Sequence, residues 1–318
     1  MKRRVQGGAL LLLLTMTAAC STERDPSDFF APQDVDVLVI DAVLIVGQTH
    51  PLVRLSRTLA PDVPYTQDGA AVVGANLAIG SAAQSVSYTD LPGGPGYYEP
   101  TGVPHTIEPE TEYQLYVETT QGEVLTARTM TPANFRVDSW VLLDPSGTTE
   151  LRQLETFADA GDSVYYRPAN QVAYAEGLIE ARFAAGGAVN FAAGGYQLSL
   201  FSIDLDSDYV IDPPFFDDED FEDLSRSGSS PALIAEDGFV RLPWFGIYFE
   251  GRHLYKVFTV DLNWFDLVRS TPQTDGGLGF GGNAGDGSNR PIFNVDGGIG
   301  LFGSASADSV GFYITPQE

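Results

Sequence analysis

The amino-acid sequence predicts a mainly β protein of two domains, and three local patterns carry this prediction. Valine recurs at every second position over 35–39, as at the start of an alternating strand. Residues 112–118 and 124–129 alternate in the same way on either side of Gln121-Gly122, which predicts a hairpin. Further short apolar runs between Pro- and Gly-rich turns bring residues 35–132 to about seven strands, a pattern typical of an immunoglobulin-like β-sandwich.

Residues 133–318 are expected to form a second, β-rich domain with one or two short helices. Among its strands, one is predicted at 239–249 and the last one at 311–315. Between these two strands Asp261 is a suitable N-cap for a short helix. The apolar residues of that helix are expected to face inward: Leu262, Phe265 and Val268.

The N-terminus has the features of a bacterial lipoprotein signal peptide, residues 1–19. Basic residues at 2–4 precede an apolar run that is too short to span a bilayer as a permanent helix. Small residues then precede Cys20, which is the only cysteine of the chain and so has no internal disulfide partner. We expect cleavage before Cys20 and lipid attachment to it, with polar residues 20–34 as a tether. The alternative is an ordinary secretory signal in which Cys20 is incidental.

Ser21 follows Cys20, where an aspartate would favour retention in the inner membrane. The expected location is therefore the outer membrane, reached through the lipid anchor. The sequence leaves open whether the protein faces the periplasm or the cell surface.

The chain is strongly acidic, with 43 Asp and Glu against 17 Lys and Arg and a formal net charge of −26. Such a surface repels nucleic acid and anionic lipid headgroups, so neither is an expected partner. Because the acidic residues are scattered along most of the chain, adaptation to a saline habitat is favoured over a cation-binding surface.

Residues 204–223 form an acidic insertion with ten acids and no base. Asp204, Asp206 and Asp208 begin like an EF-hand loop, but Tyr209 stands where the loop needs Gly and Phe215 where it needs Glu. An EF-hand is excluded. A looser Ca²⁺ site at the three aspartates stays open, beside the simpler interpretation as a solvated loop.

No catalytic or cofactor motif is found. The glycines within residues 277–282 and within residues 298–303 have the spacing of dinucleotide-binding loops, but neither segment leads into a helix. Residues 276–289 are predicted to form a Gly-rich loop. HExxH, GxSxG and CxxC are absent, and the chain has three histidines, His50, His105 and His253. We therefore predict no enzyme activity, cofactor or metal, although abundant carboxylates leave a glycosidase-like pair open.

Several segments together resemble a known family: residues 53–58, 73–79, 94–98, 113–117 and 293–303, the last reading Phe-Asn-Val-Asp-Gly-Gly-Ile-Gly-Leu-Phe-Gly. They are similar to the lipoprotein family of Bacteroidetes-type bacteria known as domain of unknown function 4249, over nearly the whole mature chain. The resemblance implies a lipid anchor, an N-terminal β-sandwich and a second domain, but supplies no catalytic residues. Members are commonly encoded near TonB-dependent outer-membrane receptors, which implies nutrient capture or surface assembly.

The glycine signature also has a structural interpretation, because glycines allow the backbone to turn tightly beside another strand while Leu301 and Phe302 pack. We expect an outer-membrane-anchored, non-enzymatic accessory or binding component of TonB-dependent nutrient uptake. The alternatives are a cell-surface adhesion or glycan-binding module and a hydrolase with a carboxylate pair.

Overall fold

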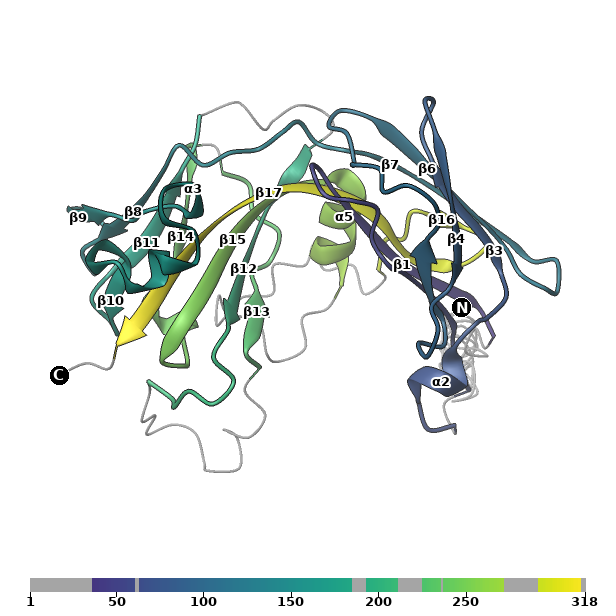
Figure 1. Ribbon diagram of the computed structural model, residues 1–318, viewed down its shortest axis with the longest axis horizontal. Helices are drawn as coiled ribbons and strands as arrows, with labels where there is room; N and C mark the ends of the chain where they lie inside the picture. The colour runs from purple at the N-terminus through teal and green to yellow at the C-terminus, as the bar shows by residue number, and fades with distance from the viewer. Residues whose placement is uncertain are drawn as a thin grey trace, which may run out of the picture.

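A computed structural model describes residues 36–60, 63–184, 193–210, 225–235, 237–271 and 291–315. In these ranges the chain is mainly β with a few short helices, as the sequence predicts (Figure 1). We call residues 36–132 the N-terminal half and residues 133–315 the C-terminal half. The elements of the N-terminal half are β1 (Leu38–Ile45), β2 (Val53–Arg57), α2 (Gln67–Ala70), β3 (Asn76–Gly80), β4 (Ser85–Asp90), β5 (Tyr97–Pro100), β6 (Glu112–Glu118) and β7 (Val124–Met130).

The C-terminal half has ten strands and short helical segments in its described residues. The strands are β8 (Ser139–Leu143), β9 (Glu150–Gln153), β10 (Gln171–Ala173), β11 (Leu178–Arg182), β12 (Ala193–Ser202), β13 (Ser227–Ser229), β14 (Phe239–Leu242), β15 (Gly251–Asp261), β16 (Val295–Asp296) and β17 (Ile299–Thr315). The helical segments are α3 (Phe157–Ala160), η2 (Gly161–Tyr166), η3 (Pro168–Asn170), η4 (Trp244–Gly246) and α5 (Leu262–Ser270). No helix of the described ranges is long and apolar enough to cross a membrane.

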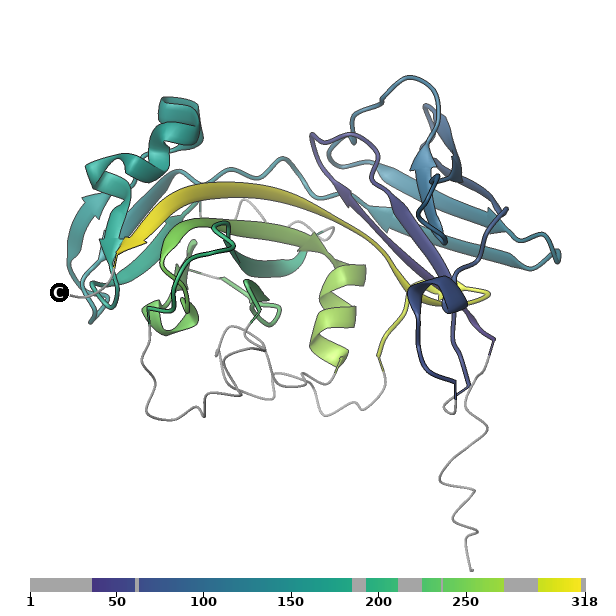
Figure 2. The same cartoon turned by 60° about the horizontal axis from the view of Figure 1, so that its bottom comes forward.

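One strand, β17, runs through both halves (Figures 1 and 2). From Ile299 to Ala305 it pairs in parallel with β1, and from Ala305 to Ile314 it pairs antiparallel with β15. The result is a 13-stranded sheet ordered β13-β12-β15-β17-β1-β2-β5-β4-β3-β6-β7-β16, to which β10 adds by pairing with β17. All strands of the N-terminal half belong to this sheet. The immunoglobulin-like arrangement of this half stays a prediction.

The predicted hairpin is confirmed, since β6 pairs with β7 from Glu112 beside Met130 to Glu118 beside Val124. Gly122 has a φ of +82° and its N–H donates to the Thr119 carbonyl at 2.9 Å. Glycine adopts this left-handed conformation without strain, which explains why the turn forms there.

Each half has its own hydrophobic core. The core of the N-terminal half gathers the inward residues of β1 to β7, and Phe302 of β17 completes it. The core of the C-terminal half lies between a second sheet, ordered β14-β11-β8-β9, and the β12-β15-β17 part of the large sheet. The second sheet contributes Trp140 and Ile179 to this core, among others. The large sheet contributes Tyr255 and Phe312. Full burial of such a side chain stabilises a fold by roughly 1.5–3 kcal/mol.

Two strand predictions were wrong in extent. The last strand begins at Ile299 and not at 311, because the small residues of 303–309 lack the alternating pattern yet pair throughout. The strand predicted at 239–249 ends at Leu242, where Pro243 starts the short η4 turn. Proline has no N–H to continue a strand ladder, which accounts for the stop.

The predicted helix is confirmed as α5, with Asp261 as its N-cap. Its inward face was only partly predicted, because Leu262 is 50% exposed. The packing contact lies at Phe265, whose ring would be 2.8 Å from a Cβ placed on Gly195 of β12. A glycine in β12 thus makes room for the helix.

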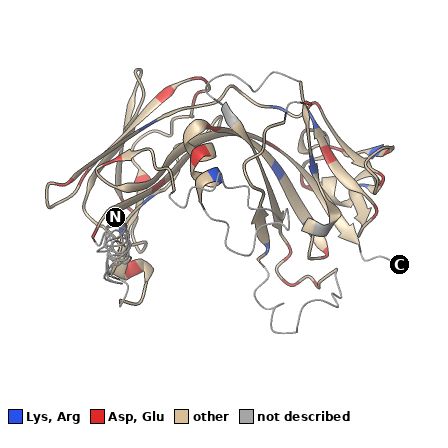
Figure 3. Cartoon of the chain, turned by 180° about the vertical axis from the view of Figure 1, so that it is seen from behind, with Lys and Arg blue, Asp and Glu red and all other residues tan. Residues whose placement is uncertain are grey.

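Charged residues of the described ranges occur in both halves of the molecule (Figure 3). The acidic residues that the structure describes are thus also spread over both halves. This arrangement supports a solvated acidic surface, because a single cation site would need its carboxylates to converge.

Candidate functional site

The two halves meet at a polar junction around Asp261, the last residue of β15. Its carboxylate accepts a hydrogen bond from the Trp264 N–H at 2.9 Å, which caps α5, and another from the Thr129 hydroxyl of β7. The Ser304 hydroxyl of β17 lies 2.8 Å from that of Thr129. Three elements that are distant in sequence are therefore joined through one carboxylate.

Asp261 is only 2% exposed, and burial raises the pKa of its carboxyl to about 6. Hydrogen bonds from Thr129, Trp264, Ser304 and Asn263 act in the opposite direction but do not outweigh desolvation. The group can therefore gain or lose a proton near neutral pH while it holds the junction.

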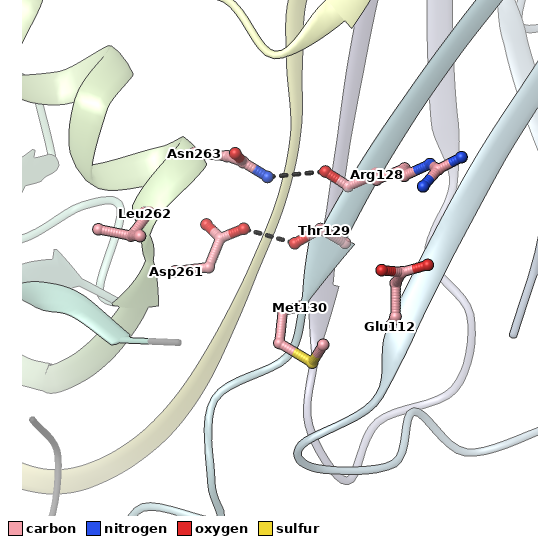
Figure 4. Close-up of a pocket in the computed structure, with 7 residues that line it drawn as sticks. All are labelled: Glu112, Arg128, Thr129, Met130, Asp261, Leu262 and Asn263. Carbon is pink, nitrogen blue, oxygen red and sulfur yellow. Dashed lines mark hydrogen bonds between the residues drawn. The ribbon is translucent and has the colours of Figure 1, made fainter. Parts of the chain in front are cut away.

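A cavity of about 220 Å³ adjoins this carboxylate. Figure 4 shows Asp261 and Thr129 pointing toward each other, whereas the Arg128 side chain extends away from Asp261, on the side of Glu112. The cavity is lined by Glu112, Arg128, Thr129, Met130, Asp261, Leu262 and Asn263. Its buried side is the junction itself, and its outer rim offers exposed charged and apolar side chains to a ligand.

A larger hollow of about 520 Å³ lies next to this cavity, and the two share Glu112. It is lined by Ala78, Gly80, Ser81, Ala82, Ser85, Thr111, Glu112, Gln114 and Tyr116. Volumes of roughly 300–1,000 Å³ are typical of small-molecule sites. The outer face of the N-terminal sheet and the junction thus form one extended candidate binding surface.

The segment that connects the two halves, residues 130–137, is bound to β17 through side chains at every second position of that strand. The Ser304 hydroxyl donates to the Met130 carbonyl at 3.1 Å. The Phe135 N–H donates to the Ser306 hydroxyl and the Val137 N–H to the Asp308 carboxylate, both at 2.9 Å. These contacts fix the segment that connects the halves.

The glycine signature has the structural role that the sequence allowed. A Cβ on Gly300, whose φ is +115°, would overlap the Ile40 carbonyl oxygen, and one on Gly298 would lie 2.7 Å from the Leu38 oxygen. The Asn294 side chain donates to the Arg128 carbonyl at 3.0 Å and to the Phe302 carbonyl at 2.7 Å. The signature therefore joins β7, β1 and β17.

The residues proposed for chemistry are not brought together. Cys20, most of the acidic insertion at 204–223 and the Gly-rich segment 276–289 lie outside the described residues. Asp204 is inside them and pairs with Arg252, at 2.6 Å, which also holds the pKa of its carboxyl below its usual range. No group of three His, Cys, Asp or Glu in the described ranges could hold a metal ion.

The histidines lie in two separate places. The N–H of His50 donates to the His105 carbonyl at 3.3 Å, and burial, with His105 nearby, lowers the pKa of His50. His253 is buried against Phe312 in the C-terminal half, with its ring 5.4 Å away, and desolvation lowers its pKa to about 4. Both are neutral core residues.

Sequence reasoning found Asp261 as a helix cap but missed its place in the junction. Thr129 is 132 residues away from it, and Ser304 lies in a strand of small residues without an alternating pattern. No local pattern links them. A polar residue at an inward strand position, such as Thr129 in β7, was the available signal.

No curated protein matches the chain in sequence. The family model described as "Domain of unknown function (DUF4249)" matches residues 24–279, which is most of the chain. The match ends before the glycine signature at 293–303, so it depends on the other segments that resemble the family. The chain therefore belongs to the DUF4249 family.

Proposed function

We propose that the chain is a lipid-anchored outer-membrane protein of a Bacteroidetes-type bacterium, and that it acts as a non-enzymatic binding accessory of a TonB-dependent receptor. Membership of the DUF4249 family and the lipoprotein signal that ends at Cys20 support this function. An immunoglobulin-like β-sandwich in the N-terminal half is part of the proposal, supported by its short, mostly antiparallel strands around one core.

The observation that carries the proposal is the position at which the tether joins the folded body. The described chain begins at Asp36, whose N–H donates to the Thr58 carbonyl, and β1 starts beside Ile299. The C-terminal half extends from the other end of this pairing, beyond Ala305. An anchor at Cys20 would thus leave the N-terminal half closest to the membrane.

In this arrangement the junction cavity lies between a membrane-proximal and a membrane-distal half. The tether of residues 20–34 would have a typical reach of roughly 20 Å as a flexible chain. The extended binding surface would then be presented within a layer close to the membrane, where the extracellular or periplasmic face of a receptor is found. That geometry suits a protein that delivers or retains a ligand.

Co-purification tests the proposal. A tagged full chain, solubilised with outer membranes in mild detergent, is expected to recover a TonB-dependent receptor identifiable by mass spectrometry. The matched control is Cys20→Ser, which should move the protein to the soluble fraction and abolish recovery of the receptor. Recovery of the anchored protein without any such receptor would contradict the accessory function, and membrane retention of Cys20→Ser would contradict the anchor.

A further inference from the structure

The outer face of the N-terminal sheet has an unusual distribution of side-chain sizes. Cross-strand pairing places Ala78 of β3 beside Tyr116 of β6, and Gly80 beside Gln114. On the far side of β3, Ala78 and Gly80 face Ser87 and Ser85 of β4. Around these positions β3 and β4 therefore present small side chains on this face, while β6 presents long ones.

This difference in size produces the hollow of about 520 Å³. A larger side chain at Gly80 would be crowded, because a Cβ there would lie 3.1 Å from the Gln84 carbonyl oxygen and 3.3 Å from the Ser85 Cα. Three residues with hydroxyl groups, Ser81, Ser85 and Thr111, are among those that line it. The hollow is thus a property of the folded sheet and is lined with groups that both donate and accept hydrogen bonds.

Tyr116 forms an aromatic wall of this hollow and is 41% exposed. Its two cross-strand neighbours, Ala78 and Thr126, are too small to cover its ring. Its hydroxyl donates to Glu118 at 3.2 Å, which holds the ring in place. An exposed aromatic ring beside hydroxyl groups offers an apolar surface next to hydrogen-bonding groups.

Planar polar side chains continue the wall toward the junction cavity. The Gln114 amide donates to the Glu112 carboxylate at 3.0 Å, and Arg128 lies directly across from Gln114 on β7. Other arginines of the described ranges, such as Arg182 and Arg252, form ion pairs, but the Arg128 guanidinium has no carboxylate partner among the described residues. Its donors are thus available to a ligand.

We propose that this hollow binds a neutral oligosaccharide. Pyranose rings present apolar C–H faces, which pack on aromatic rings, and hydroxyl groups, which planar amide, carboxylate and guanidinium groups bind in pairs. Polyanions are disfavoured by the net charge of −26. The inference rests on the proposed binding function and names its ligand class.

Binding of defined oligosaccharides to the purified full chain tests the site. The probes are maltohexaose, cellohexaose, xylohexaose and chitohexaose, with a heparin hexasaccharide as the anionic comparison, measured by isothermal titration calorimetry. At least one neutral probe is expected to bind, and Tyr116→Ala should weaken it about tenfold or more. Arg128→Ala should weaken it less, and Tyr166→Ala, which removes an exposed tyrosine of the C-terminal half, should leave it unchanged.

A second variant keeps the test independent of any damage to folding. Ala78→Leu retains every polar group but fills the floor, so it should abolish binding with an unchanged circular dichroism spectrum. Absence of binding by all neutral probes, preference for the heparin hexasaccharide, or full binding by Tyr116→Ala and Ala78→Leu would each overturn the inference. If receptor recovery survives in a chain that binds no saccharide, only the ligand class is wrong and the accessory function stands.

Discussion

The two halves of the molecule solve the same problem, burial of large aromatic side chains, in different ways. In the N-terminal half the hydroxyl of buried Tyr98 donates to the Val72 carbonyl at 2.9 Å and accepts from the Ala75 N–H at 3.1 Å. In the C-terminal half the Tyr255 hydroxyl and the Trp140 indole N–H are buried without a hydrogen-bond partner among the described residues. Their rings pack edge to face with centroids 5.4 Å apart.

This difference shows that the cores depend on different interactions. A buried polar atom without a partner costs about 1–3 kcal/mol, which aromatic packing must offset. The N-terminal core uses tyrosine hydroxyls to hold loops, whereas the C-terminal core depends on ring packing between two sheets. In the described ranges, β17 is the strand that contributes to both cores, so changes in β17 should affect both halves and changes in either core only one half.

The largest effect is expected from Gly300→Ala. The new Cβ would overlap the Ile40 carbonyl oxygen at a backbone φ of +115°, and neither main chain can move without breaking the pairing of β17 with β1. The free energy of unfolding should fall by more than about 4 kcal/mol. Urea denaturation followed by tryptophan fluorescence and by far-ultraviolet circular dichroism would measure the loss.

Two glycines serve as controls for this prediction. Gly102→Ala also has a positive φ, of +85°, but no atom lies near the new Cβ, so it should lose only about 1–2 kcal/mol. Gly311→Ala, in the part of β17 that pairs with β15, meets the ends of the Tyr165 and Phe157 rings, which can shift. Equal losses in all three variants would mean that β17 does not approach β1 as closely as described.

The junction should give the next largest effect, as a dependence of stability on pH. The pKa of Asp261 is raised to about 6 in the folded protein, so the folded state binds more protons than the unfolded state between pH 6 and 4. Its contribution to stability therefore increases as the pH falls through this range. Asp261→Asn removes this term, so the free energy of unfolding of the variant, taken relative to the parent at the same pH, should fall by about 2–3 kcal/mol from pH 7 to pH 4.

His253 in the C-terminal core should make the free energy of unfolding depend on pH in the opposite direction. Its pKa is lowered to about 4, so the unfolded state binds more protons below pH 6.5 and the stability contribution is lost as the pH falls toward 4. His253→Gln should make the stability of the chain less sensitive to acid, whereas Asp261→Asn should make it more sensitive. Urea denaturation at pH 4, 5, 6 and 7 compares the two, and the same pH response in both variants would contradict the assignment of Asp261.

The sequence could predict those parts of the fold whose partners are close along the chain. The β6–β7 hairpin carries both strands and its Gly122 turn within twenty residues, and α5 was recognisable from its Asp261 cap. The β17 strand was mostly missed because residues 303–309 are Gly, Ala, Ser and Asp, which have little alternation of large apolar side chains. Small residues are needed there because both halves and their connection pack against this strand.

The candidate site was predictable only in part for the same reason. Asp261 was expected to cap a helix, but its contact with Thr129 joins residues 132 positions apart, and the hollow beside Tyr116 depends on the register between β3 and β6. A shift of that register by one residue would place Tyr116 on the core face. No single segment contains this information.

The smallest effects test the two cores directly through removal of one hydroxyl group each. Tyr98→Phe leaves the Val72 carbonyl and the Ala75 N–H without their partner, so it should lower the free energy of unfolding by about 1–2 kcal/mol. Tyr255→Phe removes a hydroxyl that has no partner in the described chain and keeps the ring packed on Trp140, so it should be neutral or stabilising. The measurement is urea denaturation at pH 7 on both variants and the parent. A loss in Tyr255→Phe as large as that in Tyr98→Phe would mean that a buried water satisfies the Tyr255 hydroxyl, and the contrast between the two cores would then disappear.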